Sequence, residues 1–400
     1  MEKKKLYNTQ GVDSLEETLI GGNPSGLLNF NRTRYKWATS LYKTMRDCFW
    51  TPESVNTSAE SKQYAKLSEK DKFAYDRVFA RLSFLDSLVA DSLMDNLNAY
   101  VTNKIVNACL IEQSAQEVLH SKSYAVLLAD TVDDSDYVFN LYKEDLTLNA
   151  FNTAIYEMFN DINNGEVTPE KIYYAFVANQ LLEGIFFQTG FATIYDLGNT
   201  MVASASMIAE IHKDENNHIA LFENMIREFQ KENTELAWFM IRAKTNQMFD
   251  TAYKLESSWM HYILGHAYSK EVTDATVAYF IKKRQTKINM YDHETDKYGF
   301  GYETPLVKKL NNRESGNETR TNFFEGKVTT YSKQELKWDE CDDNGFGVDM
   351  PLTKTHWRFK QETYEEAIKT KDKSMQHVED RSGECVGCQM YLTKRFVFCI

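Results

Sequence analysis

The sequence predicts an all-α protein. Only 5 of its 400 residues are proline, and the stretches 53–168 and 170–304 contain none, so long helices can run there without interruption. Within both stretches the apolar residues recur at helical spacing, and no strand-like alternation of useful length is seen. Hydrophobic residues make up 42% of the chain, which excludes a wholly disordered protein and is enough for a large core.

The first three predicted helices lie within residues 34–129. One covers 34–49 and ends ahead of Pro52. The next begins at Ser68, whose hydroxyl can cap it together with Asp71, and its apolar stripe continues to Leu93. A third pattern covers 103–129, with Val106, Leu110, Leu127 and Leu128 on its stripe. All three are amphipathic and therefore expected to pack against one core.

The later helices follow the same pattern. Thr168 with Pro169 at the first helical position starts a helix that ends near Gly198. The pattern over 200–230 places Ile208 and Phe222 on one side. Further helical patterns cover 136–161, 235–267 and 272–293. The expected body is therefore helical almost to residue 297.

Three regions are expected along the chain. Residues 1–30 are glycine-containing and irregular, and 31–297 form the helical domain. From Tyr298 onward the composition changes to Gly, Asn, Thr and charged residues, which predicts a long, largely irregular C-terminal tail over 298–400 with at most a short helix near 360–372.

Charge and cysteine content narrow the functional classes. The net charge of −12 gives no basic surface for a nucleic acid or an anionic membrane. No apolar run approaches the roughly 18 residues of a membrane span, and the basic start is not followed by an apolar segment. Six cysteines do not make a disulfide framework, and Cys48 and Cys109 fit helices as small apolar residues. A cytoplasmic protein is expected.

Ionisable residues interrupt the apolar stripes of four predicted helices. They are Asp86 on the first, Glu117 and His120 on the second, Glu183 on the third, and Glu215 and His218 on the fourth. An unpaired buried carboxylate costs several kcal/mol, so four of them need compensation. For any one residue a hydrogen-bonded core position is the alternative, but for all six together metal ions are the better explanation.

The spacing of these residues fits a pair of ions. Glu and His three positions apart lie on one helix face, so Glu117 with His120, and Glu215 with His218, can each offer an oxygen and a nitrogen. Chance allows two such pairs in a chain of this composition; their position on inward stripes is the signal. Two Glu-x-x-His helices and two single-carboxylate helices are the layout of ferritin-like dimetal bundles. Carboxylate and imidazole without cysteine favour iron or manganese.

Four segments resemble the small, radical-generating subunit of class I ribonucleotide reductase. Phe84-Leu85-Asp86-Ser87 is similar to the family's first-ligand motif, and Glu117-Val-Leu-His120-Ser-Lys-Ser-Tyr124 to its Glu-x-x-His-Ser-x-x-Tyr motif. Lys213-Asp214-Glu215-Asn-Asn-His218 resembles the second ligand motif, and Phe49-Trp50-Thr51-Pro52-Glu53 a segment ahead of the bundle. The resemblance covers roughly residues 30–335.

The resemblance implies a dimetal cofactor and a radical. It implies two metal ions per chain, with iron favoured and manganese or a mixed Mn/Fe pair as alternatives; a manganese enzyme would need a flavoprotein activator. The ions would react with oxygen and leave a radical on Tyr124, which lies one helical turn beyond His120. Phe187, Phe191 and Ile211 are expected to form a dry pocket for it. An ordinary core tyrosine is the alternative.

A radical-transfer route is also implied by the resemblance. Asp214 would hydrogen-bond His120 on one side and the Trp50 indole on the other, and a second-sphere carboxylate can orient an imidazole and accept a proton. Tyr331, in Thr329-Thr330-Tyr331-Ser332, resembles the tyrosine that hands the radical to the large subunit. A packing aromatic at Trp50 and a surface charge at Asp214 are the alternatives.

The expected function is that of the small subunit of class I ribonucleoside-diphosphate reductase. It would be a homodimer that generates and stores a tyrosyl radical for a separate large subunit, and would reduce no ribonucleotide alone. A ferritin-like oxidase or hydroxylase acting on a bound organic substrate is the alternative enzyme, but it gives no reason for Trp50, Asp214 or Tyr331. Iron storage or a non-catalytic interaction protein is the third possibility, and storage proteins of this type form cages from much shorter chains without a long tail.

The end of the tail departs from the family pattern. After Tyr331 come 69 further residues, including His356-Trp357 and Cys385-Val-Gly-Cys388. A single Cys-x-x-Cys pair is weak evidence: no catalytic role is favoured, with a redox or docking role as the alternative. The apolar end Phe396, Val397, Phe398 and Ile400 suits a short anchor into a groove of the partner.

Overall fold

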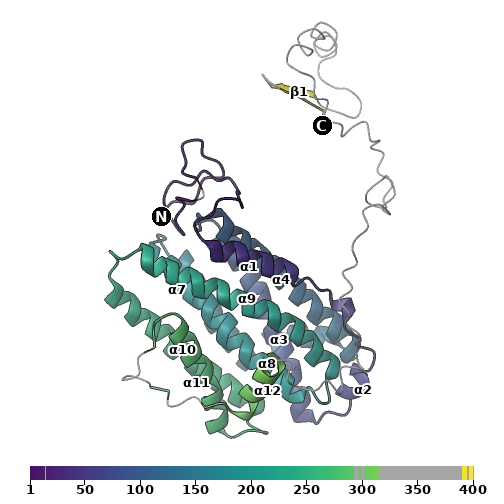
Figure 1. The fold of residues 1–400 in the computed structure, drawn as a ribbon. Coiled ribbons are helices and arrows are strands. Elements are labelled where there is room, and N and C mark those ends of the chain that lie inside the picture. Colours follow the sequence, from purple (N-terminus) through teal and green to yellow (C-terminus); the bar gives the residue numbers. More distant parts are fainter. Residues whose placement is uncertain (14, 292–296, 299–301, 315–389, 394–395, 400) are drawn as a thin grey trace. The chain divides into compact units, whose positions relative to one another are not determined.

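The computed structural model divides the chain into two units, residues 1–328 and 329–400. Figure 1 draws the described residues as a ribbon. The structure describes residues 1–13, 15–291, 297–298, 302–314, 390–393 and 396–399. Tyr331, the Cys385/Cys388 pair and the short helix expected near 360–372 lie outside these residues.

The first unit is built from helices, which confirms the all-α prediction for the body of the protein. Its α-helices are α1 Lys36–Asp47, α2 Glu60–Tyr64, α3 Glu69–Ser92, α4 Lys104–Thr131, α5 Ser135–Glu144, α6 Leu146–Asn160, α7 Pro169–Leu181, α8 Phe187–Leu197, α9 Val202–Glu232, α10 Trp238–Leu264, α11 Lys270–Lys287 and α12 Pro305–Glu314. Short turns of other helical types lie at Pro52–Ser54, Leu93–Leu97, Asp161–Asn163 and Leu182–Phe186.

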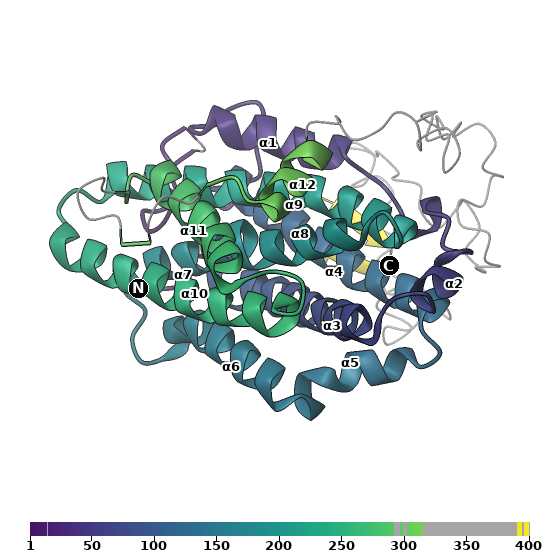
Figure 2. The ribbon, with the colours of Figure 1, turned by 90° about the horizontal axis from the view of Figure 1, so that it is seen from below.

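Four long segments close into a bundle around the core. Helix α3 packs against α4 and α8, and α9 packs against α4, α7 and α8, so α3, α4, α7–α8 and α9 form a ring. Helix α1 covers α4 and α9 (Figure 1). Helices α5 and α6 lie along α3, as Figure 2 shows from below. The ring brings the inward stripes of four helices to one buried axis.

Local capping explains where several helices begin. The Ser68 hydroxyl accepts a hydrogen bond from the Asp71 amide at the start of α3, as the sequence predicts. The Asn103 side chain accepts from the amides of Ile105 and Val106 at the start of α4. Thr168 caps α7, with Pro169 in the first helical position. These caps satisfy amides that have no partner within the helix.

One predicted helix is broken in two. The pattern over 136–161 is in fact α5 and α6, which are separated at Asp145. The Asp145 carboxylate caps α6 by accepting from the amides of Thr147 and Leu148, and it also binds Arg77. Periodicity alone missed this break because the apolar stripe continues across it.

The region expected to be tail begins with a helix. Helix α12 starts at Pro305, after Thr304, whose hydroxyl accepts from the Val307 amide, and it packs against α8. Leu306, Val307 and Leu310 are buried. A Thr-Pro start followed by Leu and Val was the signal for this helix, and the polar residues around it hid that signal.

The second unit contains a short hairpin that the sequence did not predict. Strands β1 Met390–Thr393 and β2 Phe396–Cys399 pair antiparallel, with Met390 opposite Cys399. Aromatic and β-branched residues favour such strands. In the part of the chain that the structure describes, no helix combines the length and apolar character needed to cross a membrane.

Candidate metal centre

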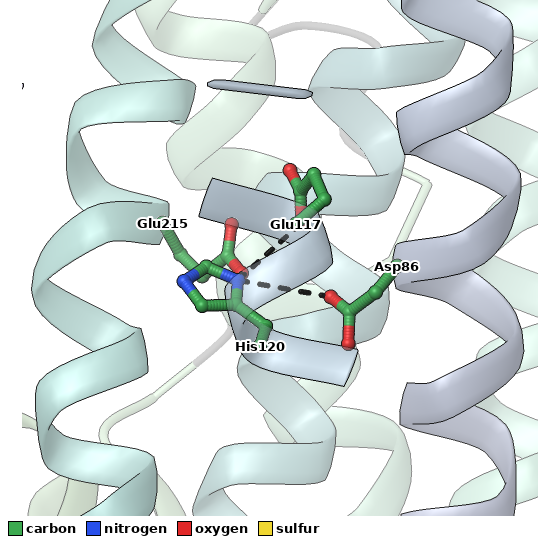
Figure 3. A group of neighbouring side chains, drawn as sticks. All are labelled: Asp86, Glu117, His120 and Glu215. Atoms are coloured by element: carbon green, nitrogen blue, oxygen red, sulfur yellow. Dashed lines mark ion pairs between the residues drawn. The ribbon is translucent and has the colours of Figure 1, made fainter. Parts of the chain in front are cut away.

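The six ionisable residues predicted as ligands meet at one place in the bundle. Helix α3 carries Asp86, α4 carries Glu117 and His120, the turn Leu182–Phe186 carries Glu183, and α9 carries Glu215 and His218. All six side chains are fully buried. Figure 3 shows Asp86, Glu117, His120 and Glu215 converging from three helices.

The residues form two overlapping groups of four. One contains Asp86, Glu117, His120 and Glu215, and the other contains Glu117, Glu183, Glu215 and His218; within each group the potential ligand atoms lie within 4.8 Å of one another. Glu117 and Glu215 belong to both. A carboxylate has two oxygens, so each shared residue can offer one oxygen to each group.

The imidazoles define the two halves. His120 Nδ1 lies 3.1 Å from Glu215 Oε1 and 3.9 Å from Asp86 Oδ1. His218 Nδ1 lies 2.7 Å from Glu215 Oε2 and 3.8 Å from Glu183 Oε2. The same ring nitrogen of each histidine therefore faces the carboxylates. We refer to the His120 half, with Asp86, and the His218 half, with Glu183.

The donor set fits two divalent cations. Both Asp86 oxygens, Glu117 Oε2, His120 Nδ1, Glu183 Oε2 and Glu215 Oε1 are buried without a hydrogen-bond partner among the described residues. Such atoms are costly unless something binds them. The four carboxylates carry four negative charges when ionised, which two divalent ions would balance. Oxygen and imidazole ligands suit iron or manganese.

Protonation within the cluster shows how strongly the charges interact. Burial raises the pKa of Asp86 and of Glu183 well above the ordinary value, and the neighbouring glutamates raise it further. Burial lowers the pKa of His120 and His218, but the surrounding carboxylates, Glu215 first, raise it well above the ordinary value. In the ion-free cluster these shifts favour protonated Asp86 and Glu183 carboxyl groups and protonated imidazoles.

Asp214 joins the His120 half to Trp50. The Trp50 indole donates to Asp214 Oδ2 at 2.7 Å, and His120 Nε2 lies 3.2 Å from the same oxygen. The Trp50 and His120 rings are stacked with centroids 6.2 Å apart. Asp214 is fully buried and is not a surface charge. The Asp214 carboxylate thus leaves His120 Nδ1 free to face the cluster.

Comparisons with known proteins identify the family of this chain. The chain matches the family described as ribonucleotide reductase, small chain, over residues 27–290. It belongs to that family. Two relatives named ribonucleoside-diphosphate reductase subunit beta are similar to this small chain. That from Treponema pallidum is 30% identical over 346 residues, covering 85% of this chain and 98% of the relative. That from Halalkalibacterium halodurans is 31% identical over 356 residues, covering 86% and 98%.

A solved structure gives the same result for the fold. The ribonucleotide reductase R2 subunit from Clostridium botulinum superimposes with a TM-score of 0.72 and 28% identity, covering 78% of this chain and 98% of that one. The resemblance to the family and the ferritin-like fold are therefore confirmed. This small chain is a subunit of an oxidoreductase, and a small subunit implies a large-subunit partner.

The small chain also holds polar residues at the site that sequence reasoning missed. Gln113 Nε2 donates to Glu183 Oε1 at 2.8 Å and to Glu117 Oε1 at 3.2 Å. Gln116 Oε1 lies 2.9 Å from His218 Nε2. Both glutamines are buried. Their spacing of four from Glu117 and His120, respectively, was the available signal.

Glu183 sits on a distorted turn of helix. The predicted helix 168–198 is present as α7 and α8, but Leu182–Phe186 between them is one turn of π-helix. A side chain on Gly184 would meet Arg284, because an added Cβ would lie 2.3 Å from Arg284 Cδ. Single π turns often mark functional sites, and here the turn presents Glu183 to the cluster.

Tyr124 and the residues expected around it are all fully buried. This includes Phe187, Phe191 and Ile211. Phe187 stacks on Phe191 with centroids 5.8 Å apart. The Phe79 ring lies 5.8 Å from that of Tyr124 in an edge arrangement, and Phe79 was not among the residues expected around it. Burial and then the Asp86 charge raise the pKa of Tyr124 well above its ordinary value.

Proposed function

We propose that this small chain binds two metal ions at Asp86, Glu117, His120, Glu183, Glu215 and His218, and uses them to generate a radical on Tyr124 for ribonucleoside diphosphate reduction by the large subunit. The observation that carries the proposal is the pair of ligand groups sharing Glu117 and Glu215. When bound, the ions would supply redox chemistry with dioxygen. Iron is favoured, and manganese or a mixed Mn/Fe pair are the alternatives.

The protein's own residues would protect and move the radical. Tyr124 is fully buried against Phe79, so water and reductants are excluded from the phenol. After burial itself, the Asp86 charge acts most strongly on Tyr124, so the phenol is coupled to the His120 half of the cluster. Asp214 accepts hydrogen bonds from Trp50 and His120, a contiguous path for electron and proton between the cluster and the indole. Tyr331 would continue the route.

The decisive experiment is electron paramagnetic resonance after metal loading and exposure to oxygen. The wild type is expected to show a tyrosyl signal and Tyr124→Phe none, with both ions still bound. Tyr75→Phe is the matched control, because Tyr75 is also fully buried and its ring also contacts Phe79. A tyrosyl signal that survives in Tyr124→Phe would overturn the assignment.

A ferritin-like oxidase is the alternative function. It would use the same ions on a bound organic substrate and would need neither Trp50 nor Asp214. Trp50→Phe separates the two functions: it should abolish ribonucleotide reduction with the large subunit while the tyrosyl signal remains. Metal analysis of protein from its native source, combined with the resonance spectrum, distinguishes iron from manganese and the need for a flavoprotein activator.

We also propose that the small chain is a homodimer. Ile111 and Val118 lie two turns apart on α4 and are 52% and 61% exposed, an apolar pair suited to a partner surface. Sedimentation should give a dimer, and Val118→Arg should give monomer. Phe239→Arg on α10 is the control, because Phe239 is 82% exposed elsewhere. A cage of many subunits would contradict both enzymatic functions.

A further inference from the structure

Gln116 is held at the junction of three helices. It lies on α4 and is 6% exposed. Its Nε2 atom is 3.3 Å from the Met45 carbonyl oxygen of α1 and 3.3 Å from Asp214 Oδ1 of α9. Both neighbours are acceptors only, because a carbonyl and an ionised carboxylate have no proton to give. The amide nitrogen of Gln116 must therefore face them, and both of its protons are used.

This orientation fixes the other end of the amide. With Nε2 turned to Met45 and Asp214, the Gln116 oxygen faces His218 Nε2 at 2.9 Å. An amide oxygen only accepts, so His218 Nε2 must carry a proton. An imidazole that binds an ion is neutral and has one N–H. With that proton on Nε2, the lone pair is on Nδ1, the atom that faces Glu215 at 2.7 Å and Glu117 at 3.2 Å.

The Asp214 carboxylate contacts the other histidine, His120, directly. His120 Nε2 lies 3.2 Å from Asp214 Oδ2, which leaves His120 Nδ1 facing its own half. Asp214 thus uses one oxygen for His120 and Trp50 and the other for Gln116. The partner of a ligand imidazole sets its tautomer and orientation.

We infer that Gln116 is a positioning residue that extends the control of Asp214 to the His218 half and holds His218 as an Nδ1 ligand. The inference rests on the proposed dimetal function. The Asp214 carboxylate orients His120 directly, whereas it acts on His218 only through the neutral Gln116 amide. Loss of the Gln116 amide should therefore weaken ion binding in the His218 half most.

The test uses Mn(II) alone, without oxygen, and each half in isolation. Asp86→Ala removes a ligand unique to the His120 half, and Glu183→Ala removes one unique to the His218 half. Gln116→Met is then added to each, since Met keeps the length of Gln without its polar atoms. In the Asp86→Ala background, Gln116→Met should lower Mn(II) affinity by about 10- to 100-fold; in the Glu183→Ala background the loss should be several times smaller.

Controls separate a failure of the inference from a failure of the proposed function. Wild-type protein that binds no Mn(II) overturns the dimetal function itself. Wild-type protein that binds two ions while Gln116→Met leaves the His218 half unchanged, or weakens both halves equally, overturns only the role of Gln116. Ser114→Ala on the same helix is the matched control, because its hydroxyl donates to the Ala90 carbonyl of α3; it should change neither half.

A second variant guards against a fault in folding. Gln116→Ala, with thermal unfolding and circular dichroism beside it, should give the same preference for the His218 half. If both variants keep the wild-type unfolding temperature and only the His218 half weakens, the loss belongs to the hydrogen bond and not to the packing of α1, α4 and α9.

Discussion

The two halves of the candidate metal centre offer the same kinds of potential ligand but hold them differently. In the His120 half, Asp86 belongs to a regular α-helix, and the His120 imidazole is hydrogen-bonded to the buried Asp214 carboxylate. In the His218 half, Glu183 belongs to a π-helical turn and accepts a hydrogen bond from Gln113. The His218 imidazole is hydrogen-bonded to the Gln116 amide. Two Glu-x-x-His helices therefore give a symmetric ligand set inside an asymmetric surrounding.

The asymmetry places the functional groups. Trp50 and Tyr124 both lie toward the His120 half, through Asp214 and through Asp86. The His218 half is enclosed by glutamines and by the π turn. Under the proposed function, the His120 half would face the radical and its transfer, and the His218 half would complete the ion pair.

The strongest test of this comparison replaces, one at a time, a residue that both halves share and a residue that belongs to one half only. Glu215→Ala should reduce bound Mn(II) from two ions per chain to less than one, because Glu215 belongs to both groups. Asp86→Ala and Glu183→Ala should each retain one ion, measured by equilibrium dialysis and metal analysis. Glu210→Ala, which pairs with Lys213 on the same helix, should retain two. Loss of both ions in Asp86→Ala would show that the halves cannot be separated.

A smaller effect is expected from the carboxylate that supports His120. Asp214→Asn keeps the shape of the side chain but removes its charge and one acceptor. The ion in the His120 half, isolated by Glu183→Ala, should bind about 10- to 100-fold more weakly, and the His218 half less so because Gln116 stands between. An equal loss of ion affinity in the two halves would mean that the Gln116 amide transmits the whole effect of the Asp214 carboxylate to His218.

The π turn gives the His218 half a structural weakness. Gly184→Ala should destabilise the protein by about 1–3 kcal/mol, because the new methyl group would displace Arg284, which is bound to Glu223. Thermal unfolding measures this. Gly190→Ala is the control: its Cβ would lie 3.1 Å from a Leu82 methyl, and the next nearest atoms, Leu82 Cγ and a Val78 methyl, would be 3.7 and 3.8 Å away; alanine also favours helix. A Gly184→Ala protein as stable as wild type would show that Arg284 moves freely.

The pH dependence should be similar in the two halves. Each contains an imidazole and a carboxyl group whose pKa is raised in the ion-free protein. Ions must displace these protons, so affinity should rise with pH, by about tenfold per unit for each proton displaced. Mn(II) titrations between about pH 6 and 8 in each isolated half test this. A flat profile in either half would contradict displacement there.

Much of the site could be predicted because helical spacing is local. Glu117 with His120 and Glu215 with His218 lie on one face whatever the rest of the fold does, and interruptions of apolar stripes at Asp86 and Glu183 mark the inward side. The caps at Ser68 and Thr168 are local in the same sense. Helix α12 and the break at Asp145 also had local signals, but composition and a continuous stripe concealed them.

The sequence by itself determined the helices, the types of the candidate ligands and their position on the inward faces of the helices. Only the tertiary structure decided that Glu117 and Glu215 are shared, that Gln116 bridges Asp214 and His218, and that Glu183 is presented by a π turn packed on Arg284. Periodicity fixes neighbours within one helix, because hydrogen bonding repeats the backbone every turn. The contacts that make the halves different join α1, α4, α9 and α11, and such contacts depend on how separate helices pack.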